Sequence, residues 1–169
     1  MYTSSHQIAN FFIRQSQATG AELTPMKLIK LCYIAHGWHL GFFDEQLLDE
    51  AIFAWKYGPV IDTLYRDFKK YGTGQITELY KDEKSGEYEF PDISKTEFLN
   101  SIWNAYRRFN GVQLSAMTHD EGTPWDITWN RNGGKNRRAA IIPNDLIKAH
   151  YKEKIAANDP SRTAEPALN

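Results

Sequence analysis

Residues 24–38 most constrain the fold, because they form a helical pattern that is apolar on nearly every face. Thr24 is a suitable N-cap, and Pro25 fits the first helical turn, where the amide hydrogen that proline lacks has no partner. The apolar side chains of this stretch are Leu28, Ile29, Leu31, Tyr33, Ile34, Ala35 and Trp38. A helix of this kind is normally buried, since none of its faces suits water. The sequence therefore predicts a central helix that the rest of the chain surrounds.

Capping residues and prolines mark the starts of further helices. The pairs Ser4–Gln7 and Ser94–Glu97 have the form of capping boxes, Pro59 can open a helix, and Asn144 can cap the last one. Apolar residues follow each start at helical spacing. About six helices are predicted in all, from seven candidate segments: 4–20, 24–38, 59–72, 94–110, 112–117, 123–129 and 144–155.

Two short runs between the helices have the pattern of strands. Ile52–Trp55 is apolar with β-branched and aromatic residues, and Glu87–Phe90 alternates polar and aromatic side chains. We expect these runs to pair. The predicted fold class is mainly α (α+β): a single-domain helical bundle with a small two- or three-stranded antiparallel sheet. The domain is expected to span residues 1–157, and the tail 158–169 is expected to be disordered.

Composition indicates which cellular compartment and which class of binding partner to expect. Twenty basic residues against 21 acidic ones give a net charge of −1, which makes nucleic acid an unexpected partner because phosphate neutralisation needs an excess of Lys and Arg. Cys32 is the single cysteine, so an internal disulfide is excluded and a reducing compartment is favoured. The chain shows neither a signal-peptide pattern nor an apolar run of membrane-spanning length. We therefore expect a cytoplasmic protein without a membrane partner.

Cys32, His36 and His39 can share one helix face, and His119 is the candidate for a fourth zinc ligand. The close ligand pairs that usually define a zinc site are absent from the sequence. Packing is the better explanation for these side chains, and burial would also make Cys32 a poor nucleophile. His119 lies beside acidic residues, as a general base can, but no nucleotide loop or nucleophile elbow accompanies it. We therefore expect no catalytic residue, metal or cofactor, with a metal-dependent hydrolase as an alternative.

A basic stretch of Arg131, Lys135, Arg137 and Arg138 contains no acidic residue. It suits phosphate or an acidic protein surface, although a solvated loop is the more common explanation. This stretch supports a second alternative, a nucleic-acid-binding regulator of phage origin. If the partner is a protein, we expect the same stretch to be an electrostatic contact.

Aromatic residues make up 14% of the chain, and two of them lie in the short segment Trp55-Lys56-Tyr57-Gly58-Pro59. Two rings two residues apart, at a Gly-Pro break, lie near the surface end of two elements. Rigid rings lose little conformational entropy on binding, so they often dominate protein interfaces. Core packing explains at least one of the two rings, and this corner is still the place where protein binding is most expected.

Three motifs in this order resemble the Panacea-domain family, which includes SocA-like antitoxins and phage-associated GepA-like proteins. The first motif is Leu23-Thr24-Pro25-Met26-Lys27-Leu28-Ile29-Lys30-Leu31-Cys32-Tyr33-Ile34-Ala35-His36-Gly37-Trp38. The second is Ala54-Trp55-Lys56-Tyr57-Gly58-Pro59-Val60, continued by Tyr65 and Lys70-Tyr71-Gly72. The third is Leu114-Ser115-x-x-Thr118-His119, followed by Pro124-Trp125. The chain departs from the family pattern at Ile29, where Gln is frequent, and at Cys32, where Leu or another apolar residue is usual.

The resemblance implies an antitoxin that neutralises a toxin protein encoded by a neighbouring gene, by direct binding or as an adaptor that delivers the toxin to a cellular protease. Composition and periodicity add only that a helical domain without a catalytic constellation suits such a role. The residues expected to contact the partner are Trp38, Trp55, Tyr57, Gly58, Pro59, Thr118, His119, Pro124, Trp125, Arg137 and Arg138.

Overall fold

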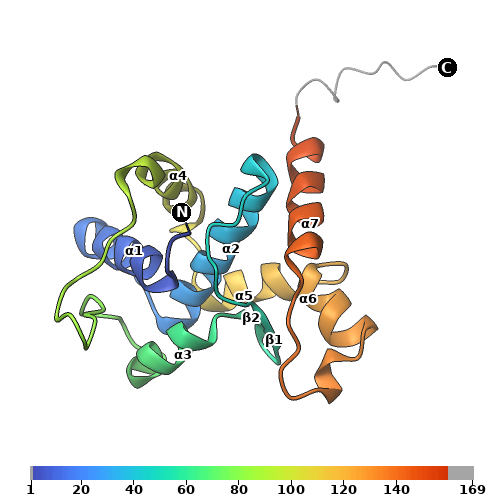
Figure 1. Cartoon of the computed structure of the whole chain (residues 1–169), viewed down its shortest axis with the longest axis horizontal. Coiled ribbons are helices and arrows are strands. Elements are labelled where there is room, and N and C mark those ends of the chain that lie inside the picture. Colours follow the sequence, from blue (N-terminus) through green and yellow to red (C-terminus); the bar gives the residue numbers. More distant parts are fainter. Residues whose placement is uncertain (1, 160–169) are drawn as a thin grey trace.

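In the computed structural model, which describes residues 2–159, helix α2 (Pro25–Phe43) runs through the middle of the molecule (Figure 1). The Thr24 side chain accepts a hydrogen bond from the Lys27 amide, and Pro25 occupies the first turn. Nearly every residue from Pro25 to Gly41 is buried, because α1, α4, α5 and α7 all pack against this helix. The prediction of a buried central helix is confirmed, and the helix continues beyond Trp38 to Phe43.

Six further α-helices and a two-stranded sheet complete the described part of the chain. The helices are α1 (Ser5–Thr19), α3 (Asp62–Phe68), α4 (Thr96–Tyr106), α5 (Gly111–His119), α6 (Pro124–Asp126) and α7 (Asn144–Ala157), and the strands are β1 (Phe53–Trp55) and β2 (Gly58–Val60). A π-helical turn, Ile127–Arg131, follows α6, and 3-10 turns lie at Lys69–Tyr71, Ile93–Lys95 and Gly134–Asn136. The predicted class, mainly α with a small sheet, is confirmed.

Two of the predicted helix caps do not form, whereas the Ser4–Gln7 capping box does. Ser94 does not cap α4, because the Asp92 carboxylate accepts from the Ser94 amide at 2.9 Å and opens a 3-10 turn before the helix. Asn144 does not cap α7 either. Its side-chain oxygen lies 2.9 Å from Nε2 of His36 on α2, so this side chain joins two helices instead.

The prediction that Pro59 opens a helix is wrong, because Pro59 lies in β2 and pairs with Ala54 of β1. Helix α3 starts only at Asp62. Proline lacks an amide hydrogen and is tolerated in edge strands. On its other side, β1 exchanges backbone hydrogen bonds with the segment from Ala140 to Ile142, which leaves β2 at the edge of the sheet.

The expected pairing of Glu87–Phe90 with the first strand is also wrong. The third segment at the sheet is Ala140 to Ile142, whose backbone bonds to Ala54 and Ile52 are both 2.8 Å long. The loop that contains Glu87–Phe90 is held against α1 by the buried Asn10, which donates to the carbonyls of Tyr80 and Glu89 and accepts from the Tyr80 amide. A buried amide with these bonds holds the loop away from the sheet.

Helix α7 lies alongside α2 because α2 carries two glycines where the helices meet (Figure 1). A Cβ atom on Gly37 would fall inside the ring of Tyr151, and one on Gly41 would lie 2.9 Å from the Tyr151 Cβ. Without these glycines the Tyr151 ring could not lie flat against α2, where it is 3% exposed.

Helix α7 ends at Ala157, and the expected disordered tail, 158–169, lies almost wholly outside the described residues, so it stays a prediction. Within residues 2–159, no helix combines the length and apolar character needed to cross a bilayer.

Candidate functional site

The hairpin formed by β1 and β2 is held from three sides by side chains that bind its backbone carbonyls. Trp125 Nε1 donates to the carbonyl of Trp55 at 2.6 Å, and Ser115 Oγ donates to that of Tyr57 at 2.7 Å. The Lys30 ammonium donates to the carbonyl of Pro59 at 2.8 Å. These contacts come from α6, α5 and α2, so the hairpin is fixed by the helical body and loses little freedom if a partner binds it.

Gly58 makes the turn of this hairpin possible. Its φ of 111° lies in the region that favours glycine, and a Cβ atom there would lie 2.9 Å from the Lys30 ammonium. Trp55 and Gly58 are paired, so the loop between the strands consists of Lys56 and Tyr57 alone. A loop of two residues projects both side chains away from the body, and Tyr57 is 62% exposed.

Beside the hairpin lies a hollow of about 360 Å³, which we call the hairpin groove. Its apolar lining comes from α2, the hairpin and α3: Met26, Ile29, Trp55, Tyr57, Val60 and Tyr65. The Trp55 and Tyr65 rings meet edge to face, 4.9 Å between centroids, and form one wall. Lys56 and Lys69 are exposed at the rim, and no Asp or Glu lines the groove. The groove is therefore an apolar cleft with a positively charged edge.

Lys30 lies at the groove with only 2% of its surface exposed. Burial lowers the pKa of its ammonium from 10.5 to about 7, since the charged form has lost its water. The hydrogen bond from this ammonium to the Pro59 carbonyl compensates for part of that loss. Burying the charged Lys30 ammonium therefore costs folding free energy, and its hydrogen bond holds the edge strand β2 in place.

The residues predicted on α5 and α6 lie next to the hairpin, but most of them are buried. Thr118 is 5% exposed and donates to the carbonyls of Leu114 and Ser115, and Trp125 is 6% exposed. Pro124 is buried too, as are Gly58 and Pro59. His119 is half-buried, with its ring tilted against Trp125 and Nδ1 3.3 Å from Ser115 Oγ. These residues shape and support the hairpin and offer a partner little surface.

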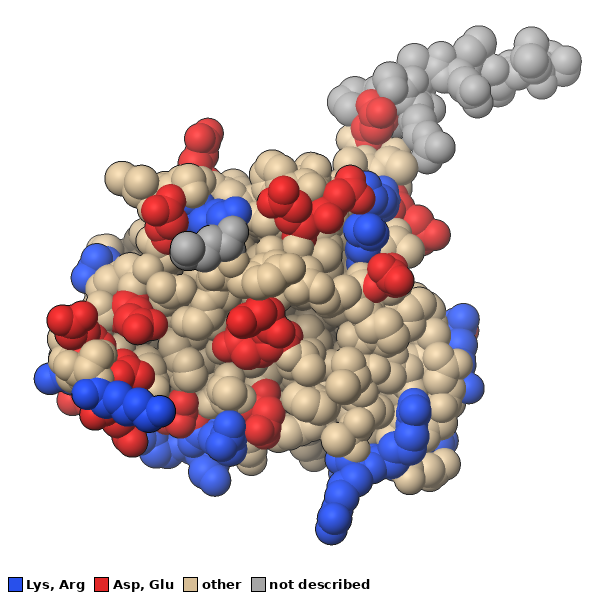
Figure 2. All heavy atoms as spheres, in the orientation of Figure 1, with Lys and Arg blue, Asp and Glu red and all other residues tan. Residues whose placement is uncertain are grey.

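Arg137 and Arg138 are exposed on the segment between α6 and α7. This segment adjoins the sheet, because its 3-10 turn packs against β1. In Figure 2, blue side chains project at the lower edge, where Figure 1 places the hairpin tip and the chain that follows α6. The two arginines therefore add positive charge to the side of the molecule that carries Tyr57.

Trp38 lies apart from the other predicted site residues, near the opposite end of α2. Its Nε1 donates to the Tyr106 hydroxyl at 2.8 Å, and its ring stacks on Phe42 at 5.5 Å. Phe42 and Phe43 are 55% and 53% exposed, and Phe43 also contacts Phe98. We call Trp38, Phe42 and Phe43 the α2-end patch. Sequence reasoning missed the two phenylalanines, although two adjacent aromatics in the last turn of a helix were a visible signal.

His36 and His39, the two α2 histidines considered as zinc ligands, have both ring nitrogens engaged in hydrogen bonds. His36 Nδ1 accepts from the Leu48 amide at 3.3 Å, which leaves Nε2 to donate to Asn144 Oδ1. His39 Nδ1 lies 2.7 Å from the Glu45 carbonyl, and Nε2 lies 3.1 Å from the Lys95 ammonium. Both rings are therefore neutral, and burial lowers both pKa values. Across residues 2–159, no cluster of His, Cys, Asp and Glu is arranged to hold a metal ion.

Known proteins that are similar to this chain belong to the family that the three motifs indicate. The family model described as "Antitoxin SocA-like, Panacea domain" matches residues 28–126, from α2 to α6. "Antitoxin SocA" of Caulobacter vibrioides (strain NA1000 / CB15N) is 28% identical to the chain over 160 residues, which cover 90% of this chain and 85% of that protein. No solved structure matches the chain. The matched region contains α2, the hairpin and α5, and the chain belongs to the SocA-like antitoxin family with a Panacea domain.

Proposed function

We propose that this protein is a cytoplasmic antitoxin that binds a toxin protein encoded by a neighbouring gene, with the hairpin groove as its contact surface. Membership of the SocA-like antitoxin family supports the role. The observation that carries the choice of surface is Tyr57, a 62% exposed ring on a hairpin whose backbone is held by α2, α5 and α6. An exposed aromatic on a rigid support has the properties of an interface hot spot.

The lining of the groove defines the chemistry of the toxin segment that fits it. Met26, Ile29 and Trp55 offer an apolar floor, and Lys56 and Lys69 place ammonium groups at the rim. Arg137 and Arg138 extend the same charge beyond the hairpin. The complementary segment carries apolar side chains flanked by Asp or Glu, because opposite charges at an interface rim raise the rate of association and disfavour basic partners.

Replacing Tyr57 with Ala is expected to weaken toxin binding by about 30-fold, since a central tyrosine in an interface contributes about 2 kcal/mol. The unfolding temperature should stay unchanged, because the ring is mostly exposed. Tyr88→Ala is a matched control: Tyr88 is 54% exposed, and a lysine lies over its ring as Lys56 lies over that of Tyr57. Titration calorimetry with the purified toxin measures both. Equal affinities for the two variants would exclude the hairpin groove as the contact.

The α2-end patch favours a second candidate function, an adaptor that delivers the toxin to a cellular protease. An adaptor needs a second surface away from the toxin, and Phe42 and Phe43 lie at the opposite end of α2 from Met26. Side chains of this size rarely stay exposed in pairs without a partner. If this protein is an adaptor, a Phe42→Ser/Phe43→Ser variant will bind the toxin normally, and the lifetime of the toxin in cells that produce both proteins will increase. An unchanged toxin lifetime would leave simple blocking as the mechanism.

The antitoxin role itself is tested by co-expression with the product of the neighbouring gene. We expect that product to arrest growth alone and to be harmless beside this protein. A product that is harmless alone, or that stays toxic in the presence of this protein, would exclude the proposed pair. Because an antitoxin acts by binding, no enzymatic activity is needed to explain protection.

A further inference from the structure

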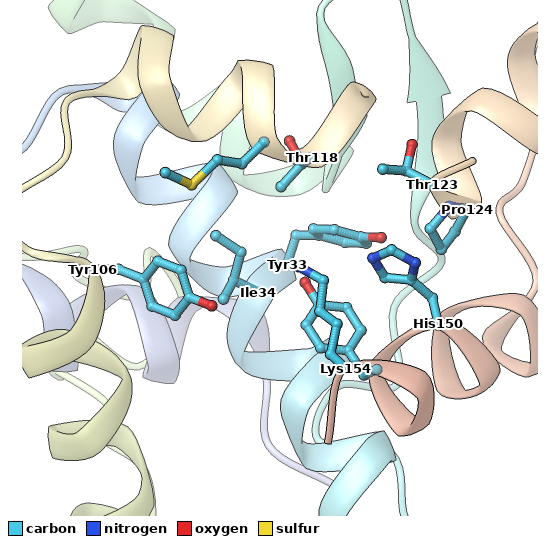
Figure 3. A pocket seen from close by; sticks show the side chains of 10 residues that line it. Tyr33, Ile34, Tyr106, Thr118, Thr123, Pro124, His150 and Lys154 are labelled. Carbon is cyan, nitrogen blue, oxygen red and sulfur yellow. The ribbon is translucent and has the colours of Figure 1, made fainter. Parts of the chain in front are cut away.

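A second hollow, of about 90 Å³, lies between α2, α4, α5 and α7, and polar side chains converge on it (Figure 3). We call it the tyrosine pocket, because Tyr33, Tyr106 and Tyr151 all line it. His150 and Lys154, one helical turn apart on α7, complete its polar lining together with two threonines. Thr118 lines this pocket and also lies 3.5 Å from the Cβ position of Gly58, so α5 separates it from the hairpin groove.

Two tyrosine hydroxyls of this pocket have no hydrogen-bond partner within the described residues. Tyr33 and Tyr151 are 1% and 3% exposed, yet neither hydroxyl forms a hydrogen bond to another residue of the described chain. The Tyr106 hydroxyl accepts from Trp38 Nε1 and keeps its own hydrogen available. In Figure 3 the Tyr33 hydroxyl points toward the space between Pro124 and His150. The hydroxyl oxygens of Tyr33 and Tyr151 are not fully enclosed by protein atoms, so these hydroxyls can donate to a ligand that enters the pocket.

The lining of the pocket carries positive charge, and the carboxylates of Asp120 and Glu153 act on it from outside the lining. Lys154 lies over the Tyr151 ring, 5.4 Å from its centroid, and forms no ion pair with a carboxylate among residues 2–159. Burial lowers the pKa of Lys154, and the Asp120 carboxylate raises it by a smaller amount. No Asp or Glu is among the residues that line the pocket. Tyrosine hydroxyls, an imidazole and an ammonium are all hydrogen-bond donors, so the lining suits an acceptor that carries negative charge.

We propose that the tyrosine pocket binds a small oxyanion, a phosphate or carboxylate group, held by the Lys154 ammonium and by the hydroxyls of Tyr33 and Tyr151. The pocket volume of about 90 Å³ suits a small oxyanion. One water molecule needs only about 10–15 Å³ of such space, whereas a drug-sized ligand needs several hundred. The site is separate from the toxin contact, so it stands or falls independently of the antitoxin role.

Titration of the purified protein with inorganic phosphate and with acetate, at ionic strength matched by chloride, tests the site. We expect saturable binding in about the millimolar range, seen by calorimetry and as a rise in the unfolding temperature. Binding of phosphate alone assigns the site to phosphate groups, and binding of acetate as well, or alone, assigns it to carboxylates. Absence of saturable binding of both up to about 50 mM would overturn the proposal and leave water as the occupant.

Two variants separate a specific site from general attraction of anions. Lys154→Met should weaken binding about tenfold or more, and Tyr33→Phe, which removes one hydroxyl and keeps the ring, about threefold. Lys152→Met is the matched control, because it removes the same charge from the exposed side of α7, where Lys152 pairs with Asp44. We expect it to bind like the native protein. Equal affinity of native protein and Lys154→Met, or an equal loss in Lys152→Met, would overturn the site.

Discussion

Replacing Gly37 with Ala is expected to destabilise the protein by about 3 kcal/mol or more, although the same change in an ordinary helix interior stabilises it by about 1 kcal/mol. The reason is the ring of Tyr151 on α7. A Cβ atom at position 37 would lie 2.5 Å from the Tyr151 Cζ, far inside the normal carbon–carbon contact of about 3.5–4 Å. The ring cannot swing away, because it is 3% exposed and packs edge to face against Trp38. Relief therefore requires α7 to move from α2.

Urea unfolding of Gly37→Ala measures this effect, and Gly41→Ala provides a graded comparison on the same helix. At position 41 the nearest atoms lie 2.9–3.3 Å from the new Cβ, and one of them is the flexible end of Ile155, so a smaller loss is expected. In a Gly37→Ala/Tyr151→Ala double variant the clash is gone, and the loss should be smaller than the sum of the single losses. An unchanged or raised stability of Gly37→Ala would contradict the packing of α7 on α2.

The free energy of unfolding is expected to rise as the pH is raised from 7 to 9, by an amount on the order of 2 kcal/mol. Lys30 is the main cause, because burial lowers its pKa from 10.5 to about 7 in the folded protein. At a pH between the folded pKa and the unfolded pKa of Lys30, the unfolded chain holds a proton that the folded protein has released. Raising the pH therefore favours the folded state. Below pH 7 both states are protonated and the full cost of burying the charge remains. Above about pH 9 the trend is opposed and then reversed, because burial raises the pKa values of Cys32, Tyr33 and Tyr151 and the unfolded chain releases these protons first.

Denaturant unfolding at pH 7, 8 and 9 measures this slope, and Lys30→Met identifies its source. The variant deprives the Pro59 carbonyl of its donor, so the readout is the slope and not the absolute stability. We expect most of the rise to disappear. A smaller rise should remain, because burial also lowers the pKa values of Lys27 and Lys154. A slope equal to that of the native protein would show that Lys30 keeps its ordinary pKa when buried.

Elements whose signals are local could be predicted from the sequence. The caps at Ser4 and Thr24 form as expected, because each side chain bonds an amide three residues ahead. Pro59 was misassigned because its fixed φ suits both the first turn of a helix and an edge strand, and the choice depended on distant partners. Those partners are the Ala54 strand and the Lys30 ammonium, and neither is visible in the neighbouring sequence.

The sequence suggested a contact surface around Trp55–Pro59, which stays a prediction, but it did not show which of the proposed residues are exposed. Trp55 and Trp125 both appeared as contact residues, whereas in the fold the Trp125 indole binds the Trp55 carbonyl and is itself buried. Exposure depends on which elements cover a side chain, and a single sequence does not record that. Tyr57 alone of the three remains mostly exposed, because a two-residue turn directs it away from the body.

The sequence by itself determined that the chain is mainly helical, that Pro25–Phe43 contains a buried helix and that the motifs of an antitoxin family are present. These features depend on periodicity, capping and residue order, which are properties of neighbouring residues. Only the tertiary structure decided that Lys30 and Trp125 hold the hairpin, and that Gly37 admits Tyr151. The physical reason is that such contacts join residues far apart in the chain, and their energies depend on burial and fit, which exist only once the elements have packed.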